Sequence, residues 1–219
     1  MFSKKLIVAL DFSSFQEVNE FIKYIDPLKC LVKVGLQLYT SCGNKVIELL
    51  AEKGFEIFLD LKLHDIPNTV KKTINEISSS SIVMTTIHLS GGEKMIDDAC
   101  ESKGNIKIIG VSLLTSLDHN DVNELYNRDI EQQIMVLKDL ASRTKIDGIV
   151  CSPKELPLLS DFKKLKVVPG IRNIYGEDDQ KRVLSSKEAY AYGADYIVVG
   201  RPITEAADKA KAFNDYLWI

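Results

Sequence analysis

Oppositely charged side chains stand close together in otherwise apolar segments of this sequence. Asp60 and Lys62 are two residues apart, so in a β-strand both side chains would point to the same face. Lys33 lies inside an apolar run, where an ammonium group is poorly solvated unless a carboxylate or an anionic ligand meets it. Asp11 ends the preceding apolar run. A single pair of opposite charges could be a salt bridge that only fixes the packing of the strands. Four alternating charges at neighbouring strand ends instead indicate a functional site.

Two glycine and arginine pairs near the C-terminus suit a phosphate group. Gly170 precedes Arg172 at the end of one apolar run, and Gly200 directly precedes Arg201 at the end of the next. Glycine lets backbone N–H groups approach a ligand closely, and arginine adds charge-assisted hydrogen bonds. The two pairs together predict a phosphorylated ligand.

Two other polar features of the sequence each allow two interpretations. The stretch 173–180 lies between the two glycine and arginine pairs, and it is either a solvated loop or a lid that closes on a ligand. Asp65 comes shortly before Pro67, where it suits the N-cap of a helix. Asp65 could have a functional role in addition to capping the helix. The histidines His64, His88 and His119 are interpreted as packed or hydrogen-bonded side chains rather than as catalysts.

Several other classes of function lack their sequence patterns. No HExxH motif, EF-hand loop, P-loop or clustered His/Cys set occurs, so we expect neither a dedicated metal site nor nucleoside triphosphate hydrolysis. Lys and Arg total 28 against 31 Asp and Glu, a net charge of −3 that gives no attraction to nucleic acid. The apolar runs are too short for a membrane span, and the first ten residues are too short for a signal peptide. Four scattered cysteines without a CxxC pair predict reduced, buried thiols in a cytoplasmic protein.

The elements that must position these groups alternate along the whole chain. Eight short runs rich in β-branched residues are separated by amphipathic segments such as Phe15–Ile25, and Gly54 and Gly193 stand where helices should end. The expected strands are Leu6–Asp11, Cys30–Gly35, Glu56–Leu63, Ile82–Ser90, Ile106–Leu114, Gly148–Ser152, Lys166–Ile171 and Tyr196–Gly200.

These runs are almost continuously apolar, which is typical of a parallel sheet buried on both faces. Eight strand–helix units in 219 residues, without a linker, predict an α/β fold, a single-domain (β/α)8 TIM barrel over residues 1–219. A doubly wound open sheet is the alternative, but the first strand does not end in a glycine-rich dinucleotide turn. Functional groups of such barrels collect at the C-terminal ends of the strands, where the charges described above would meet.

Taken together, these residues resemble the orotidine 5′-monophosphate decarboxylase family. The most specific match is Asp60-Leu61-Lys62-Leu63-His64-Asp65-Ile66-Pro67-Asn68-Thr69, which fits the DxKxxDI signature and its HDIPNT extension. The similarity covers nearly the whole chain in order and includes Pro169-Gly170-Ile171-Arg172 and Gly200-Arg201-Pro202-Ile203. The chain departs from the family at Asn173, where proline is frequent, and in a short lid segment.

The resemblance implies an activity and a set of site residues. The reaction would convert orotidine 5′-monophosphate to UMP and CO2 without a cofactor or metal, in a homodimer with shared active sites. Lys62 would donate a proton to the pyrimidine carbon that loses CO2. The catalytic set would be Lys62, Asp60, Lys33 and the Asp65 of the second subunit. The substrate-binding set would be Asp11, Lys33, Asp60, Ile66, Thr69, Thr115, Pro169, Arg172, Gln180, Gly200 and Arg201.

Two alternatives remain at this point. Metal-dependent sugar-phosphate decarboxylases and aldolases of the same superfamily share DxKxxD, although they typically continue the motif with a different loop. The Ile66-Pro67-Asn68-Thr69 continuation favours the orotidylate branch. A catalytically silent nucleotide-binding barrel is the second alternative, and the intact set of Asp60, Lys62 and Asp65 argues against it.

Overall fold

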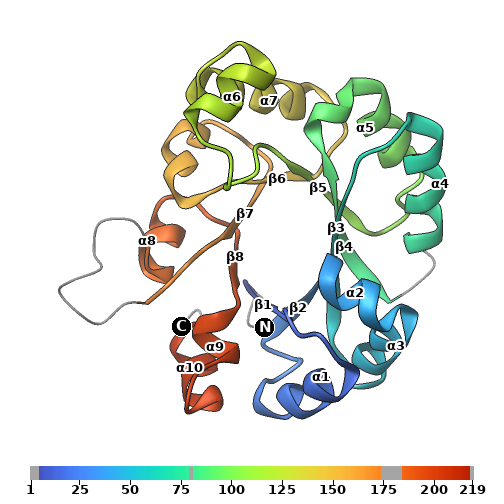
Figure 1. The fold of residues 1–219 in the computed structure, drawn as a ribbon, viewed down its shortest axis with the longest axis vertical. Coiled ribbons are helices and arrows are strands. Elements are labelled where there is room, and N and C mark those ends of the chain that lie inside the picture. The colour runs from blue at the N-terminus through green and yellow to red at the C-terminus, as the bar shows by residue number, and fades with distance from the viewer. Residues whose placement is uncertain (1–4, 79–80, 174–183, 218–219) are drawn as a thin grey trace.

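The strands of this protein form a closed parallel barrel. The computed structural model describes residues 5–78, 81–173 and 184–217. In this part of the chain eight strands pair in chain order, and β8 pairs with β1 to close the ring (Figure 1). Their bounds are β1 Leu6–Ala9, β2 Cys30–Gly35, β3 Glu56–Leu63, β4 Ile82–His88, β5 Lys107–Val111, β6 Gly148–Val150, β7 Leu165–Pro169 and β8 Tyr196–Val199. The predicted (β/α)8 architecture is confirmed.

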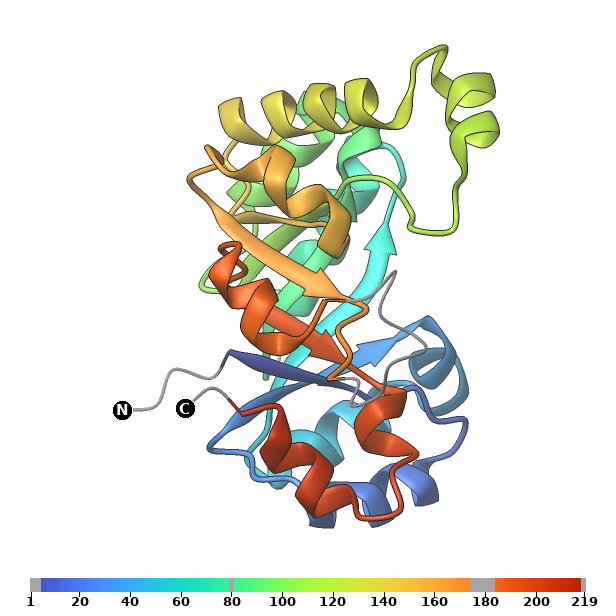
Figure 2. The same cartoon turned by 90° about the vertical axis from the view of Figure 1, so that its left-hand side faces the viewer.

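Helices surround the strands on the outside of the barrel (Figures 1 and 2). The α-helices are α1 Phe15–Phe21, α2 Leu36–Cys42, α3 Asn44–Glu52, α4 Pro67–Ser78, α5 Gly92–Glu101, α6 His119–Tyr126, α7 Ile130–Arg143, α8 Ser186–Ala191, α9 Arg201–Thr204 and α10 Lys209–Asp215. The 3-10 helices are η1 Ile22–Tyr24, η2 Leu89–Gly91 and η3 Pro153–Leu159.

The helix after β6 is a 3-10 helix instead of an α-helix. The 3-10 helix η3 contains Pro157, whose ring removes a backbone N–H and clashes with an α-helical turn. The predicted helix Phe15–Ile25 likewise ends early as α1 and continues as η1. Gly54 and Gly193 follow their helices with φ values of 79° and 90°, which confirms them as helix stops.

Most strands are shorter at their C-terminal ends than the apolar runs predicted. Residues beyond the strands, such as Leu10, Leu113 and Ile171, remain buried, although they no longer belong to a strand. The apolar pattern therefore continues into loop segments that pack over the barrel, and hydrophobicity alone could not show where the strands end.

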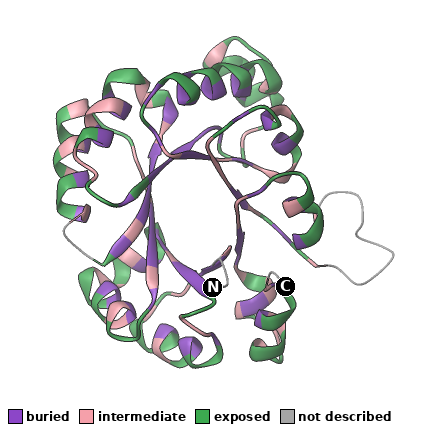
Figure 3. Ribbon diagram, turned by 180° about the vertical axis from the view of Figure 1, so that it is seen from behind, coloured by how far each residue is buried: buried purple, intermediate pink, exposed green. Residues whose placement is uncertain are grey.

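Two apolar clusters are built from alternate residues of the strands. The larger one lies between strands and helices, and Figure 3 shows the buried strands ringed by helices whose outer faces are exposed. The smaller one belongs to strand residues alone and fills the barrel interior: Ile7, Ala9, Leu31, Phe58, Met84, Ile109, Val167 and Val198. Inward-pointing side chains next to this cluster, toward the C-terminal ends of the strands, surround one open end of the barrel, which we call the mouth.

Candidate active site

The charged residues continue the inward-pointing pattern of the barrel core. Asp11, Lys33 and Asp60 each follow a residue of the interior cluster by two positions, at the C-terminal side of β1, β2 and β3. Because side chains two apart in a strand share a face, the three side chains lie one layer above that apolar cluster. The strand alternation therefore places them together at the mouth, as the sequence predicted.

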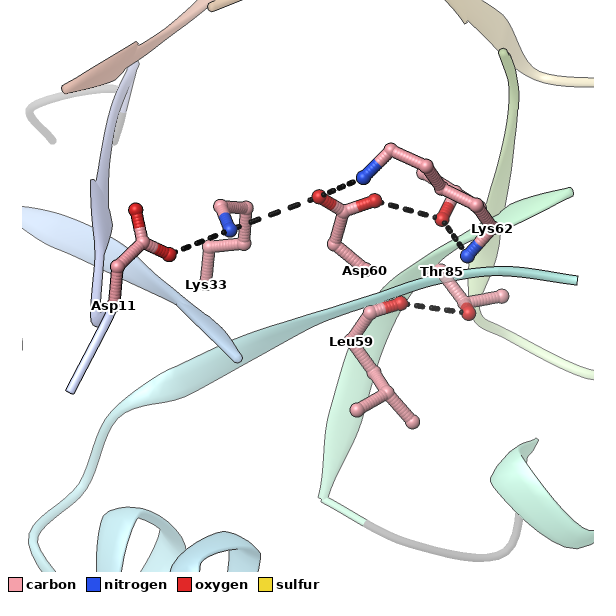
Figure 4. Close-up of polar contacts among 7 residues, drawn as sticks. Asp11, Lys33, Leu59, Asp60, Lys62 and Thr85 are labelled. Carbon is pink, nitrogen blue, oxygen red and sulfur yellow. Dashed lines mark hydrogen bonds and ion pairs between the residues drawn. The ribbon is translucent and has the colours of Figure 1, made fainter. Parts of the chain in front are cut away.

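The four predicted charges form one continuous row of ion pairs (Figure 4). Lys33 Nζ lies 3.2 Å from Asp11 Oδ1 and 3.7 Å from Asp60 Oδ2. Lys62 Nζ lies 2.9 Å from the same Asp60 Oδ2. The side chains of Asp60 and Lys33 are 11% and 13% exposed, whereas that of Lys62 is 32% exposed. Asp60 is thus the buried centre of the row, and the ammonium group of Lys62 faces the more open mouth.

Lys62 occupies an unusual backbone conformation. Its φ is 50°, in the left-handed region that residues other than glycine adopt at an energetic cost. The pairing between β3 and β4 shifts register at this point, from Leu59 opposite Thr85 to Leu63 opposite Ile87. Such bulges re-aim side chains and are frequent beside active sites. The bulge lies at Lys62, the residue to which the family resemblance assigns proton donation.

A threonine that the sequence interpretation missed contacts this bulge. Thr86 Oγ1 accepts a hydrogen bond from Lys62 N–H at 2.9 Å and donates one to Asp60 Oδ1 at 2.9 Å. Thr86 is completely buried, two residues after the interior residue Met84. The two-residue alternation of side chains along β4 could have predicted that Thr86 points into the barrel. It could not have predicted the contact of Thr86 with the bulge.

Three site residues implied by the family resemblance, Asp65, Ile66 and Thr69, lie apart from the charged row within one chain. Asp65, Ile66 and Thr69 are exposed, and Ile66 has 67% of its surface accessible. Asp65 Oδ1 accepts a hydrogen bond from Ile66 N–H, one residue before α4 begins at Pro67. This contact differs from an N-cap, in which the side chain binds N–H groups of the first helical turn.

The remaining predicted residues surround the mouth on the β5, β7 and β8 side. Thr115, Pro169 and Gly170 line one cavity of about 490 Å³. Gly200 lies beside Asp11, since a Cβ at this position would be in van der Waals contact with Asp11 Oδ2 at 3.4 Å.

The two arginines follow neighbouring strands of the same mouth. Exposed Arg201 begins α9 directly after β8, and exposed Arg172 follows β7. The two side chains thus lie on the elements where the sequence expected a phosphate, and their contact with a phosphate stays a prediction.

Asn173 anchors the start of the segment that was interpreted as a loop or a lid. Its backbone N–H donates to Tyr216 Oη at 2.7 Å, and its side-chain oxygen accepts from Ser186 N–H at 2.9 Å. Its side-chain amide also donates to the carbonyl oxygen of Asp215 at 3.1 Å. Proline has no N–H for the Tyr216 contact, so asparagine gives this chain an attachment that proline cannot make. Gln180 lies outside the described residues.

Two histidines stack beside the charged row. The ring centroids of His64 and His88 are 5.2 Å apart. Burial, the neighbouring His64 and the ammonium group of Lys62 lower the pKa of His88, while Asp60 acts in the opposite direction. His88 is therefore neutral at neutral pH and adds no second positive charge near Lys62.

The cysteines only partly match the prediction of buried thiols. All four are free, and Cys30, Cys100 and Cys151 are buried, but Cys42 is partly exposed near the end of α2. Burial raises the pKa of Cys100 to about 11 and raises that of Cys151 further, so both thiols are protonated at neutral pH.

The described residues contain neither a membrane-spanning helix nor a cluster of metal ligands. No helix among residues 5–78, 81–173 and 184–217 is long and apolar enough to cross a membrane. Over the same ranges, His, Cys, Asp and Glu side chains form no cluster of three or more that could hold a metal ion.

The arrangement is suited to stabilising negative charge and delivering a proton. A fixed ammonium group at a water-poor site stabilises an anion that develops beside it more strongly than solvent does. Lys62 is held by Asp60 on one side and faces the mouth on the other, so it can also act as a general acid.

Comparisons with known proteins agree with this geometry. The model of the Orotidine 5′-phosphate decarboxylase / HUMPS family matches residues 4–216. The chain is 42% identical to the orotidine 5′-phosphate decarboxylase of Ehrlichia chaffeensis, over 99% of this chain and 97% of that one. It is 39% identical to the enzyme of that name from Saccharophagus degradans, over 96% and 92%.

A solved structure shows the same similarity in three dimensions. The orotidine 5′-phosphate decarboxylase of Lactobacillus acidophilus superposes with a TM-score of 0.85 at 34% identity, covering 98% of this chain and 99% of that one. The family match spans the charged row, the bulge and both arginines. This chain belongs to the Orotidine 5′-phosphate decarboxylase / HUMPS family.

Proposed function

We propose that this protein is an orotidine 5′-monophosphate decarboxylase that forms UMP and CO2 in de novo pyrimidine biosynthesis, without a cofactor. The observation that carries the proposal is the continuous row of ion pairs formed by Asp11, Lys33, Asp60 and Lys62 at the barrel mouth. A pyrimidine that loses CO2 leaves a carbanion with little resonance stabilisation, so the site must supply the stabilisation electrostatically. Lys62 is the residue that supplies it.

The reaction step assigns a role to each charge of the row. The bond between the pyrimidine ring and its carboxylate breaks, CO2 leaves, and the electron pair stays on the ring carbon. The Lys62 ammonium group stabilises that charge and donates a proton to the carbon, and the neutral amine then regains a proton from water. Asp60 near the substrate carboxylate disfavours the charged ground state more than the transition state, where that charge departs. Lys33 holds Asp60, Asp11 holds Lys33, and Lys33 and Asp11 contact the ribose.

The other predicted residues bind parts of the substrate remote from the reacting carbon. Arg172, Arg201 and Gly200 bind the phosphate, and Gln180 joins base and phosphate. Thr115 hydrogen-bonds the pyrimidine edge, and Pro169 packs near it. Such remote contacts can help to assemble the catalytic site, because the free energy of binding these parts of the substrate is used to orient the groups around the reacting carbon.

We also propose that residues 1–219 form one domain that acts as a homodimer with shared active sites in the cytoplasm. Asp65, Ile66 and Thr69 are exposed at the end of the loop after β3 and the start of α4, and Ile66 presents an apolar side chain to solvent. A second subunit that covers this loop would bury Ile66 and bring Asp65 toward the partner's Lys62. The three buried thiols are compatible with a reducing compartment.

One assay tests the activity directly. Release of CO2 from orotidylate is measured with and without a metal chelator. Turnover that resists the chelator supports the proposal, whereas magnesium-dependent turnover of a sugar phosphate would select the related metal-dependent enzymes. Binding of UMP without any turnover would indicate a silent nucleotide-binding barrel.

Subunit mixing tests the shared site. Asp65→Ala and Lys62→Ala homodimers should each be nearly inactive, because every site carries one lesion. A statistical mixture contains about half heterodimers, in which one site has both lesions and the other is intact, so activity should recover to roughly a quarter of wild type. If heterodimers form by mass spectrometry but activity does not return, Asp65 serves its own chain.

A further inference from the structure

We infer that Thr86 is a positioning residue for the decarboxylation, because one hydroxyl fixes both the carboxylate of Asp60 and the strained backbone of Lys62. The inference rests on the proposed function, for which Asp60 and Lys62 perform the chemistry. Thr86 itself is completely buried below the mouth, and we assign it no contact with substrate.

The need for such a residue follows from the bulge in β3. Between the pairs Leu59–Thr85 and Leu63–Ile87, three residues of β3 stand opposite Thr86 alone. The extra length interrupts the regular ladder, so backbone groups in the bulge need other partners. A left-handed φ at Lys62 further raises the energy of this segment, and such a conformation persists only where its surroundings enforce it.

The hydroxyl of Thr86 supplies the missing ladder contact. Its oxygen accepts from Lys62 N–H at 2.9 Å, and its proton goes to Asp60 Oδ1 at 2.9 Å. A hydroxyl can do both at once because it has one donor and two acceptor sites. The side chain of valine has nearly the same shape and can do neither.

The two contacts act on both ends of the reactive ion pair. Asp60 uses Oδ1 for Thr86, which leaves Oδ2 directed at the ammonium groups of Lys62 and Lys33. The same hydroxyl also binds the backbone N–H of Lys62. The position of the Lys62 backbone, from which its side chain extends, is therefore fixed relative to the Asp60 carboxylate. Loss of the hydroxyl frees the carboxylate to rotate and Lys62 to leave its strained conformation.

Thr85 provides a matched control on the same strand. It is also completely buried, and its Oγ1 donates to the carbonyl oxygen of Leu59 at 2.8 Å, as Figure 4 shows. That bond joins β4 to β3 without involving a charged side chain. Thr85→Val therefore removes a buried hydroxyl and one hydrogen bond from the same pair of strands, but leaves the charged row intact.

The first experiment compares the kinetics of Thr86→Val, Thr86→Ser and Thr85→Val. Thr86→Val should lower kcat for orotidylate by about 100-fold, since a small misplacement of catalytic groups has an effect of this size, while KM changes far less. Thr86→Ser keeps the hydroxyl and should restore most of the lost kcat. Thr85→Val should also lower the melting temperature, though less than Thr86→Val because it loses one neutral hydrogen bond instead of two, and it should keep kcat near wild type.

Two kinetic outcomes would overturn the inference. Equal losses of kcat in Thr86→Val and Thr85→Val would mean that Thr86 only supports the strands. Failure of Thr86→Ser to restore kcat would mean that the hydroxyl is not the acting group. If Thr86→Val does not fold, Thr86→Ala removes the same hydroxyl with less bulk, and the same comparisons apply.

Crystal structures separate this inference from the proposed function. In Thr86→Val, φ of Lys62 should leave the left-handed region and the contact between Lys62 Nζ and Asp60 Oδ2 should lengthen, whatever substrate the enzyme uses. An unchanged Lys62 backbone and ion pair would refute the role of Thr86 even if the wild type decarboxylates orotidylate. A wild type inactive on orotidylate with the expected rearrangement in the variant would refute only the substrate.

Discussion

Removing the central anion of the charged row should destabilise the protein far more than removing its outer cation. The two perturbations are Asp60→Asn and Lys62→Ala, which break the same ion pair from opposite ends. After Lys62→Ala, Asp60 still has Lys33 Nζ at 3.7 Å and the Thr86 hydroxyl at 2.9 Å. After Asp60→Asn, the ammonium groups of Lys33 and Lys62 face each other across a neutral amide.

The geometry sets the size of the two effects. Both ammonium groups contact the same oxygen, so they lie within about 7 Å of each other and repel by about 2 kcal/mol at an effective dielectric constant of about 20. This repulsion is present with and without Asp60, so Asp60→Asn removes only the two attractions that offset it, and we expect the free energy of unfolding to fall by about 2–4 kcal/mol. Lys62 is 32% exposed, so its removal should cost at most about 1 kcal/mol.

Urea denaturation at fixed protein concentration measures both free energies, with the concentration held constant because assembly would shift the transition. Repeating it at high salt tests the cause, since repulsion between the partly exposed ammonium groups is screened. The penalty of Asp60→Asn should shrink at high salt, and that of Lys62→Ala should change little. Equal penalties, or a salt-independent penalty for Asp60→Asn, would refute the idea that Asp60 separates two lysines.

Two further predictions concern the backbone of Lys62 and the proton affinity of His88. Lys62→Gly should be more stable than Lys62→Ala by about 1 kcal/mol in urea denaturation, because glycine tolerates the φ of 50°, and equal stabilities would show that the conformation carries no strain. Burial lowers the pKa of His88 below 6.5, so the unfolded chain binds its proton first and stability falls as the pH drops below about 6.5. His88→Gln should flatten this fall in urea midpoints between about pH 7 and 5, and an unchanged slope would assign it to other groups.

The barrel and its charged row could be predicted because both follow from simple periodicities. Eight apolar runs that alternate with amphipathic segments specify the fold, and the structure confirms it. The two-residue alternation places Asp60 and Lys62 on one face, and Lys33 needed a carboxylate because of its apolar surroundings. It has two, Asp11 and Asp60.

Other features depend on contacts that no local pattern encodes. Cys42 was expected to be buried, but it ends a short helix beside Gly43 and is partly exposed. That Asp65 acts in the site of a second subunit is an expectation from the family resemblance alone, and one chain by itself leaves this residue exposed.

The bulge in β3 shows why a correct placement of charges stops short of a mechanism. In a regular strand Asp60 and Lys62 would already share a face, so the alternation explains their proximity without any irregularity. The structure instead interrupts the ladder there and holds Lys62 at a φ of 50°. Because strain of this kind must be maintained by surrounding contacts, the hydroxyl of Thr86 is as much a part of the site as the charges that the sequence displays. Chemistry-bearing residues can be found by type and spacing, but the residues that aim them are found through the hydrogen bonds they make.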